Sequence, residues 1–208
     1  MQPAAPSPGE LYLALMVMGL PLLSFFVVFF VTRGRVNLSC AISLACSALP
    51  LLSAVYLLAS HWRMPAPVLW QVSWMRGGGA EVTFGFLLDH LSLLMLVIVT
   101  GVSFLVQVYS LGYMAGDPGK AKYYAFLSLF AWSMISMVLA SGLMQLYIFW
   151  ELVGLSSYLL IGFWHHKFSA SQAGKKAFVM TRLGDLGFFL GIIVLLLNLG
   201  DLSILGLN

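Results

Sequence analysis

The sequence has very little charge. Of its 208 residues, 10 are Lys or Arg and 7 are Asp or Glu, so only 8% are charged, whereas 61% are hydrophobic. Soluble domains carry about a quarter of their residues as charged side chains, so this chain has too little polar surface to cover a globule in water. The composition excludes a soluble domain and predicts an all-α membrane protein in a lipid bilayer. The net charge of +3 comes without a basic, aromatic-rich stripe, which excludes nucleic acid as a partner.

Motifs that hold cofactors are also missing. The sequence has no CxxC pair, no Walker motif and no dinucleotide-binding glycine motif. Cys40 and Cys46 are six residues apart, about 9 Å along a helix and about 120° around it, so they cannot form a disulfide. We therefore expect no cofactor and no metal on this chain, and any redox chemistry must take place on another chain.

Long uncharged stretches predict about six transmembrane helices. A helix needs about 20 apolar residues to cross a hydrocarbon core of roughly 30 Å, so spans are read as gaps between charges. The stretch 123–166 holds a single charge, Glu151, and is long enough for two spans joined by a turn at Ser141 and Gly142. The prediction is one transmembrane domain over 1–208, with spans at about 12–31, 38–59, 91–109, 124–140, 143–163 and 178–199.

Basic residues are concentrated in alternate connections, which predicts the orientation. The connections after spans one, three and five carry Arg33, Arg35, Lys120, Lys122, Lys167, Lys175 and Lys176, and the opposite side carries only Arg63 and Arg76. Because Lys and Arg favour the cytoplasmic side, both termini are expected on the outer, periplasmic side of a bacterial inner membrane. Only Glu10 is charged before the first span, so the basic region of a secretory signal is missing and this helix is expected to be retained.

The connection between the second and third spans has a strand-like pattern. Trp70, Val72 and Trp74 alternate with polar residues, three glycines follow at 77–79, and 82–84 is a second apolar stretch. This pattern predicts a small hairpin on the outer membrane face. The alternative is an irregular interfacial loop with aromatic anchors. His61, at the start of this connection, is expected to be a hydrated loop residue.

Glu151 is expected to lie near the middle of the fifth span, about 12 Å along the helix from Leu143. An acidic group at that depth costs roughly 2.5–3.5 kcal/mol, so it should point into the bundle, toward the sixth helix. We interpret Glu151 as an ionisable carboxylate on a proton path. The alternative is a protonated side chain that only makes a hydrogen bond between helices. Gly154, Tyr158 and Gly162 follow on the same helix face.

The beginning of the sixth span carries four more charges: Lys175, Lys176, Arg182 and Asp185. Lys176, Arg182 and Asp185 are candidates for the same proton path, and Arg182 and Asp185, three residues apart, are expected to pair. Lys175 is expected to extend to the inner membrane surface. Glycines at 184, 187 and 191 form a smooth strip along which a neighbouring helix is expected to pack closely.

Three further polar side chains are candidates for a proton relay: Tyr158, His165 and His166. The two imidazoles end the fifth span at the inner surface, where they either relay protons or lie among lipid headgroups. Adjacent residues on a helix point about 100° apart, so a metal shared between the two histidines is not expected.

Four segments resemble a known family. They are LDHLSLLM from Leu88, YSLGYM from Tyr109, WELVGLSSYLLIGFW from Trp150 and KAFVMTRLGD from Lys176. Together they resemble the subunit L family of the proton-pumping NADH:quinone oxidoreductases, respiratory complex I. The resemblance runs in order along nearly the whole chain, and the segment around Glu151 is the most diagnostic.

This resemblance implies an antiporter-like subunit that couples quinone reduction to proton translocation, with other membrane subunits of the same complex as partners. It implies that Glu151 pairs with a lysine on a seventh helix, and that Lys176, Arg182 and Asp185 match charged positions on the sixth. The sequence departs from the family because it stops at Asn208, before the broken helix, its lysine and the second repeat. We therefore expect the N-terminal part of a longer subunit, or a truncated product.

Two other readings remain open. Subunits of Mrp-type cation/proton antiporters, energy-converting hydrogenases and bicarbonate uptake systems resemble the same family and differ in their neighbouring chains. A non-conducting membrane scaffold belongs to another functional class. It predicts that neutralising Glu151 leaves proton pumping unchanged.

Overall fold

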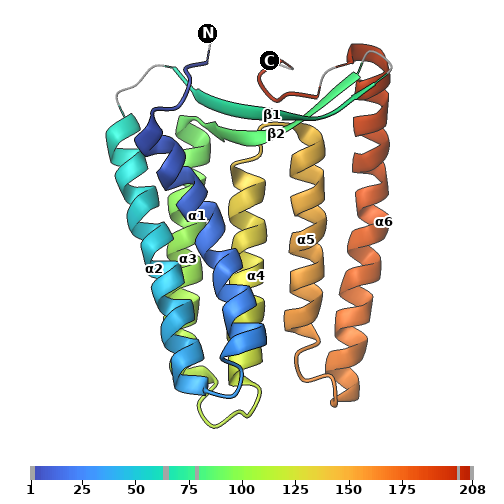
Figure 1. Ribbon diagram of the computed structural model, residues 1–208. Helices are drawn as coiled ribbons and strands as arrows, with labels where there is room; N and C mark the ends of the chain where they lie inside the picture. The colour runs from blue at the N-terminus through green and yellow to red at the C-terminus, as the bar shows by residue number, and fades with distance from the viewer. Residues whose placement is uncertain (1–2, 63–65, 78–79, 201, 207–208) are drawn as a thin grey trace.

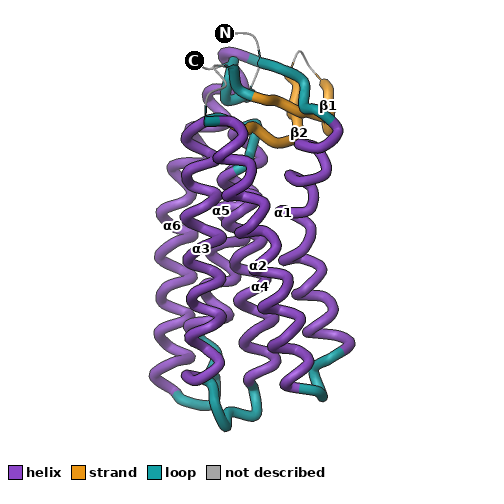
Figure 2. Tube along the Cα trace, turned by 90° about the vertical axis from the view of Figure 1, so that its left-hand side faces the viewer, coloured by secondary structure: helices purple, strands orange, loops and turns teal. Residues whose placement is uncertain are grey.

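The computed structural model describes residues 3–62, 66–77, 80–200 and 202–206. Six long helices lie side by side, and a two-stranded hairpin crosses one end of the bundle, where both termini also lie (Figure 1). The view turned by 90° shows the same arrangement, with connecting loops at the opposite end (Figure 2). We call these two ends the hairpin end and the loop end.

The six helices agree with the predicted all-α membrane fold. Their bounds are α1 Pro8–Phe26, α2 Val36–His61, α3 His90–Tyr113, α4 Lys120–Val138, α5 Leu143–Ile161 and α6 Phe168–Leu199, and α1 continues as a π-helical turn, η1, over Val27–Val31. All except α4 are long and apolar enough to cross a membrane. The chain is therefore a multi-pass membrane protein.

Helix α4 differs because of its position. It packs against α1, α2, α3 and α5, so most of its surface contacts protein. Its buried residues include three serines, Ser128, Ser133 and Ser136. Because α4 is enclosed, the Ser128 hydroxyl can bond the Ser24 and Ser43 hydroxyls inside the bundle.

Local capping residues define where two helices begin. Ser7 accepts a hydrogen bond from the Glu10 amide while the Glu10 carboxylate accepts one from the Ser7 amide, a capping box that starts α1. Asp89 and Ser92 form the same reciprocal pair at the start of α3. At the far end of α6, Gly200 adopts the left-handed conformation that commonly ends a helix.

The connection between α2 and α3 forms a hairpin rather than an irregular loop. Strands β1 Val68–Gly77 and β2 Ala80–Leu88 pair antiparallel, with a bulge between Ser73 and Met75. Gly85 is required here because a Cβ at this position would collide with the Trp70 carbonyl oxygen. The structure therefore has the strand pairing that the alternating sequence pattern indicated.

Contacts distant in sequence hold the hairpin end together. The Gln145 side chain, only 2% exposed, accepts from the Gly85 amide at 2.9 Å and donates to the Gly85 carbonyl at 2.8 Å. The backbone of Ala4 pairs with β1 through Leu69, and the Leu143 amide donates to the Leu202 carbonyl. Both terminal segments and the start of α5 are thus fixed around the hairpin.

Three expectations differ from the structure. Helix α6 begins at Phe168, ten residues before the expected span, because a helix can extend beyond the apolar region that defines a span. Outside α6 itself, no described atom lies within 4 Å of a Cβ built at Gly184, Gly187 or Gly191, so α6 packs on α5 through other residues and not along this strip. His61 is the last residue of α2 and is buried, with its Nε2 2.8 Å from a Glu10 carboxylate oxygen.

Candidate functional site

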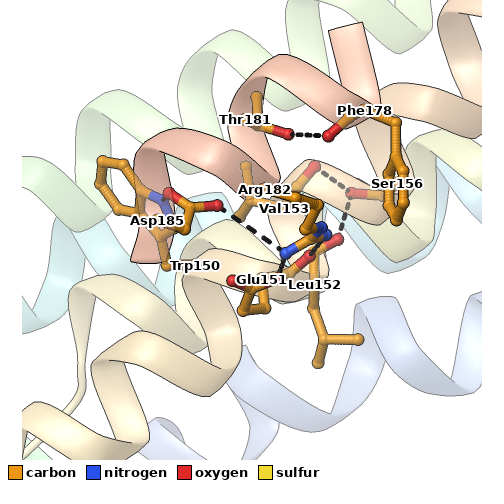
Figure 3. A network of polar contacts seen from close by, with 9 residues as sticks. All are labelled: Trp150, Glu151, Leu152, Val153, Ser156, Phe178, Thr181, Arg182 and Asp185. Carbon is orange, nitrogen blue, oxygen red and sulfur yellow. Dashed lines mark hydrogen bonds and ion pairs between the residues drawn. The ribbon is translucent and has the colours of Figure 1, made fainter. Parts of the chain in front are cut away.

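Glu151 and Arg182 form an ion pair between α5 and α6. The Arg182 guanidinium contacts the Glu151 carboxylate, and about a quarter of each side chain is exposed. The same guanidinium donates through Nη2 to the Glu151 carbonyl at 2.8 Å. Figure 3 shows both interactions within one polar network. Glu151 therefore points toward the sixth helix, as its charge in a membrane span required.

The surroundings of Arg182 explain how the two helices admit a guanidinium between them. Its central carbon lies 4.6 Å from the centre of the Phe178 ring, a cation–π contact. A Cβ on Gly154 would lie 3.1 Å from Arg182 Nη2. Gly154 thus leaves the room that the guanidinium occupies.

Asp185 extends the network on α6. Its side chain accepts a hydrogen bond from the Trp150 indole at 2.8 Å, and its second oxygen lies 3.8 Å from Arg182 Nη1. The expected pair of Arg182 and Asp185 is present, but the guanidinium is engaged mainly by Glu151. Two carboxylates therefore share one cation.

The other basic candidate on α6 lies apart from this network. Lys176 is exposed, and it precedes Arg182 by six residues, which places the two side chains about 120° apart around the helix. The structure does not bring Lys176 to Glu151. Lys175 is exposed as well.

The relay candidates lie toward the loop end. Tyr158 follows Glu151 by seven residues on α5 and packs its ring 5.4 Å from that of Phe178. His165 and His166 lie in the turn after α5 and are exposed. Tyr158 and His165 both line a cavity of about 170 Å³, together with Lys122 and Ser171. None of these side chains contacts Glu151 within the described segments.

A second indole–carboxylate contact ties the loops together at the loop end. The Trp164 indole donates to Asp117 at 2.9 Å, and the Gly119 amide donates to the other Asp117 oxygen at 2.7 Å. These hydrogen bonds favour the ionised form and lower the pKa of the Asp117 carboxyl. The contact joins the α3–α4 connection to the α5–α6 connection.

Trp150 was not among the candidate residues from the sequence. Its indole partner, Asp185, lies 35 residues away, and an aromatic residue in a membrane span is usually a packing or lipid-facing residue. The only sequence signal is its position directly before Glu151.

Models of known families match two parts of the chain. Residues 74–124 match the family described as NADH-ubiquinone oxidoreductase (complex I), chain 5 N-terminus, and residues 140–208 match the family described as NADH:quinone oxidoreductase/Mrp antiporter, TM. The second match includes Glu151, Arg182 and Asp185.

Individual relatives agree with these matches. The chain is 54% identical over 122 residues to the NAD(P)H-quinone oxidoreductase chain 5 of Synechocystis, covering 59% of this chain and 18% of that one. It is 46% identical over 134 residues to the NADH-quinone oxidoreductase subunit L of Mycobacterium tuberculosis, covering 64% and 21%. The chain thus spans about a fifth of the length of these relatives.

Solved structures share the fold. A chain of the membrane-bound sulfane sulfur reductase, an archaeal respiratory membrane complex, superimposes with a TM-score of 0.78 at 20% identity, covering 91% of this chain and 38% of that one. A chain of the Mrp complex from Dietzia sp. superimposes with a TM-score of 0.74 at 23% identity, covering 93% and 20%. The chain belongs to the family of antiporter-like membrane subunits found in complex I, and it matches their N-terminal portion.

Proposed function

We propose that this chain acts as a proton-translocating part of an NADH:quinone oxidoreductase, with Glu151 as the group that takes up and releases the proton. The observation that carries the proposal is the ion pair of Glu151 and Arg182 between two membrane-spanning helices. Charged groups in a membrane are costly and are found mainly where they bind or move ions. In this proposal the redox chemistry belongs to other chains of the complex.

The geometry supports a mechanism based on one shared cation. While Arg182 contacts Glu151, its positive charge favours the ionised carboxylate. When the guanidinium moves to Asp185, whose nearer oxygen is 3.8 Å away, Glu151 loses its partner in a poorly hydrated site and takes up a proton. Return of the guanidinium then favours release of that proton.

The test replaces Glu151 by Gln, which keeps the size and the hydrogen bonds and removes the titratable proton. In the membrane complex that contains this chain, reconstituted in sealed vesicles, proton pumping coupled to quinone reduction should fall sharply. Glu151→Asp keeps the charge with a shorter reach and should cause a partial loss. Lys175→Gln, an exposed residue on α6, is the control and should pump normally. Normal pumping by Glu151→Gln would instead favour the scaffold function.

We also propose that the loop end faces the cytoplasm of a bacterial cell and that both termini lie on the outer side of the inner membrane. The basic residues 33, 35, 120, 122 and 167 all flank the loop-end connections, as the positive-inside rule requires. In a variant without Cys40 and Cys46, Pro118→Cys should react only with reagents that reach the cytoplasm, and Ser73→Cys only with reagents outside. The reverse pattern would overturn the orientation.

The runner-up is a subunit of an Mrp-type cation/proton antiporter, which the fold shared with the Dietzia Mrp complex favours. The two functions differ in what drives proton movement. Vesicles that pump protons with NADH and quinone in the absence of a sodium gradient support the respiratory function. Proton movement that requires a cation gradient and ignores NADH supports the antiporter.

A further inference from the structure

Two adjacent residues of α5 hold two residues one turn apart on α6. Glu151 binds Arg182, and Trp150, directly before it, donates its indole N–H to Asp185. Figure 3 shows the four side chains together, with dashed lines that join Arg182 to Glu151 and to Asp185. The four side chains therefore form one connected unit rather than two separate contacts.

Asp185 is the competing partner for Arg182. Its side chain is 11% exposed, less than the side chains of Arg182 and Glu151. One oxygen accepts the indole N–H at 2.8 Å, while the other lies 3.8 Å from the guanidinium, at the outer limit of an ion pair. A carboxylate whose one oxygen is fixed by a neighbouring donor cannot turn freely to bind a guanidinium with both oxygens.

The indole itself is held in place. The Trp150 ring packs edge to face against Phe188 of α6, with centroids 6.2 Å apart. This contact holds the ring with its N–H toward Asp185, although Trp150 as a whole is 46% exposed. The donor is thus supplied by a ring whose position α6 itself fixes.

We propose that Trp150 is a positioning residue that determines how Arg182 is divided between Glu151 and Asp185. By holding Asp185, it keeps the guanidinium on Glu151 in the resting arrangement. The inference rests on the proposed function of Glu151. Among the described residues, the charged groups that face Glu151 are Arg182 of α6 directly and Asp185 of α6 through it.

Trp150→Phe is the test, because it keeps an aromatic ring and removes the indole N–H donor. Asp185 then becomes free to bind Arg182, and Glu151 loses its cation. The midpoint of the pH dependence of proton pumping should move upward by about one pH unit. This is the lower end of the range by which a neighbouring positive charge changes the titration of a carboxyl group. Trp164→Phe removes the other indole donor near α5, which binds Asp117 outside the site, and should leave the midpoint unchanged.

A second variant separates positioning from folding. Asp185→Asn still accepts the indole N–H but cannot compete for the guanidinium as an anion. In the Asp185→Asn background, Trp150→Phe should therefore cause no further shift of the midpoint. An equal shift in both backgrounds would overturn the inference, because the effect would then not pass through Asp185.

The outcomes also separate this inference from the proposed function. If Glu151→Gln abolishes pumping while Trp150→Phe leaves the pH profile unchanged, the role of Trp150 is overturned and the function of Glu151 stands. If Glu151→Gln pumps normally, the proposed function falls, and infrared spectroscopy still tests the contact. A carboxylate band of Asp185 that shifts in Trp150→Phe supports the positioning of Asp185, and an unchanged band contradicts it.

Discussion

The bundle formed by α1 to α4 and the pair α5–α6 use different polar contacts inside the same fold. In the bundle, Ser128 bonds Ser24 at 3.0 Å and Ser43 at 2.9 Å, and Ser43 donates to Gln107 at 2.9 Å. All four side chains are at most 2% exposed. Between α5 and α6 the contacts are ionic, and Glu151 and Arg182 are about a quarter exposed.

This difference helps to distinguish polar contacts that join helices in a membrane protein from charged groups that serve its function. Hydroxyl and amide groups join helices at little desolvation cost and add modest stability. Ions in the same medium are costly, so a buried ion pair is weak evidence for stability and stronger evidence for function. On this basis we assign a supporting role to the bundle, and the proposed proton-carrying group lies in the pair α5–α6.

Removing the cation should have the largest effect. Arg182→Gln leaves Glu151 without a partner, and we expect pumping to fall by about tenfold or more, with a loss of about 1–2 kcal/mol in stability because the pair is only partly buried. Pumping in vesicles and thermal unfolding of the purified complex measure the two effects. Arg182→Lys, which keeps the charge without the guanidinium fork, should retain part of the activity. Full proton pumping by Arg182→Gln would mean that the ion pair between α5 and α6 is a structural contact, like the hydrogen bonds of the bundle.

Removing the side-chain amide of Gln107 from the bundle should affect stability and leave proton pumping unchanged. Gln107→Leu deletes the acceptor of Ser43 and should cost about 1 kcal/mol, the usual net value of one hydrogen bond. Ser43 keeps its contact with Ser128, which limits the loss. Thermal unfolding should therefore shift slightly while pumping per intact complex stays at the original rate. A pumping defect without a change in unfolding would assign the bundle a direct part in transport.

The smallest effect is expected at the loop end, where Asp117 links the two connections. A carboxyl with a lowered pKa stabilises the folded state at pH above its ordinary value, about 3.9, and this contribution is lost as the pH falls through the lower folded value. At pH 7, Asp117→Asn should therefore unfold at a slightly lower temperature than the original protein, and this difference should shrink as the pH falls below the ordinary value of the carboxyl pKa. A difference that grows toward acid pH would mean that the sign of this contribution is wrong.

The sequence predicts what is local or set by the solvent. Six helices and the strand pairing follow from patterns within about 20 residues. The direction of the Glu151 side chain follows from the cost of charge in lipid. These features need no knowledge of which helices become neighbours.

The remaining features depend on such neighbours. His61 was expected to be a hydrated residue because nothing near it in sequence reveals that Glu10, at the start of α1, lies beside the end of α2. The glycines at 184, 187 and 191 were assigned a helix contact from their size alone, yet the backbones of α5 and α6 approach closely at Gly162 and Gly174. Trp150 gains its role from Asp185, a residue that only the packing of α5 on α6 brings within reach.

The contact between Gln145 and Gly85 bears on the order of assembly during synthesis. Until Gln145 is made, 60 residues after Gly85, the amide and carbonyl of Gly85 that it later binds remain available to other backbones. An unpaired strand edge of this kind is a template for wrong pairing. The start of α5 therefore closes the hairpin as well as leading to Glu151, and a nascent chain released before Gln145 would expose an edge prone to aggregation.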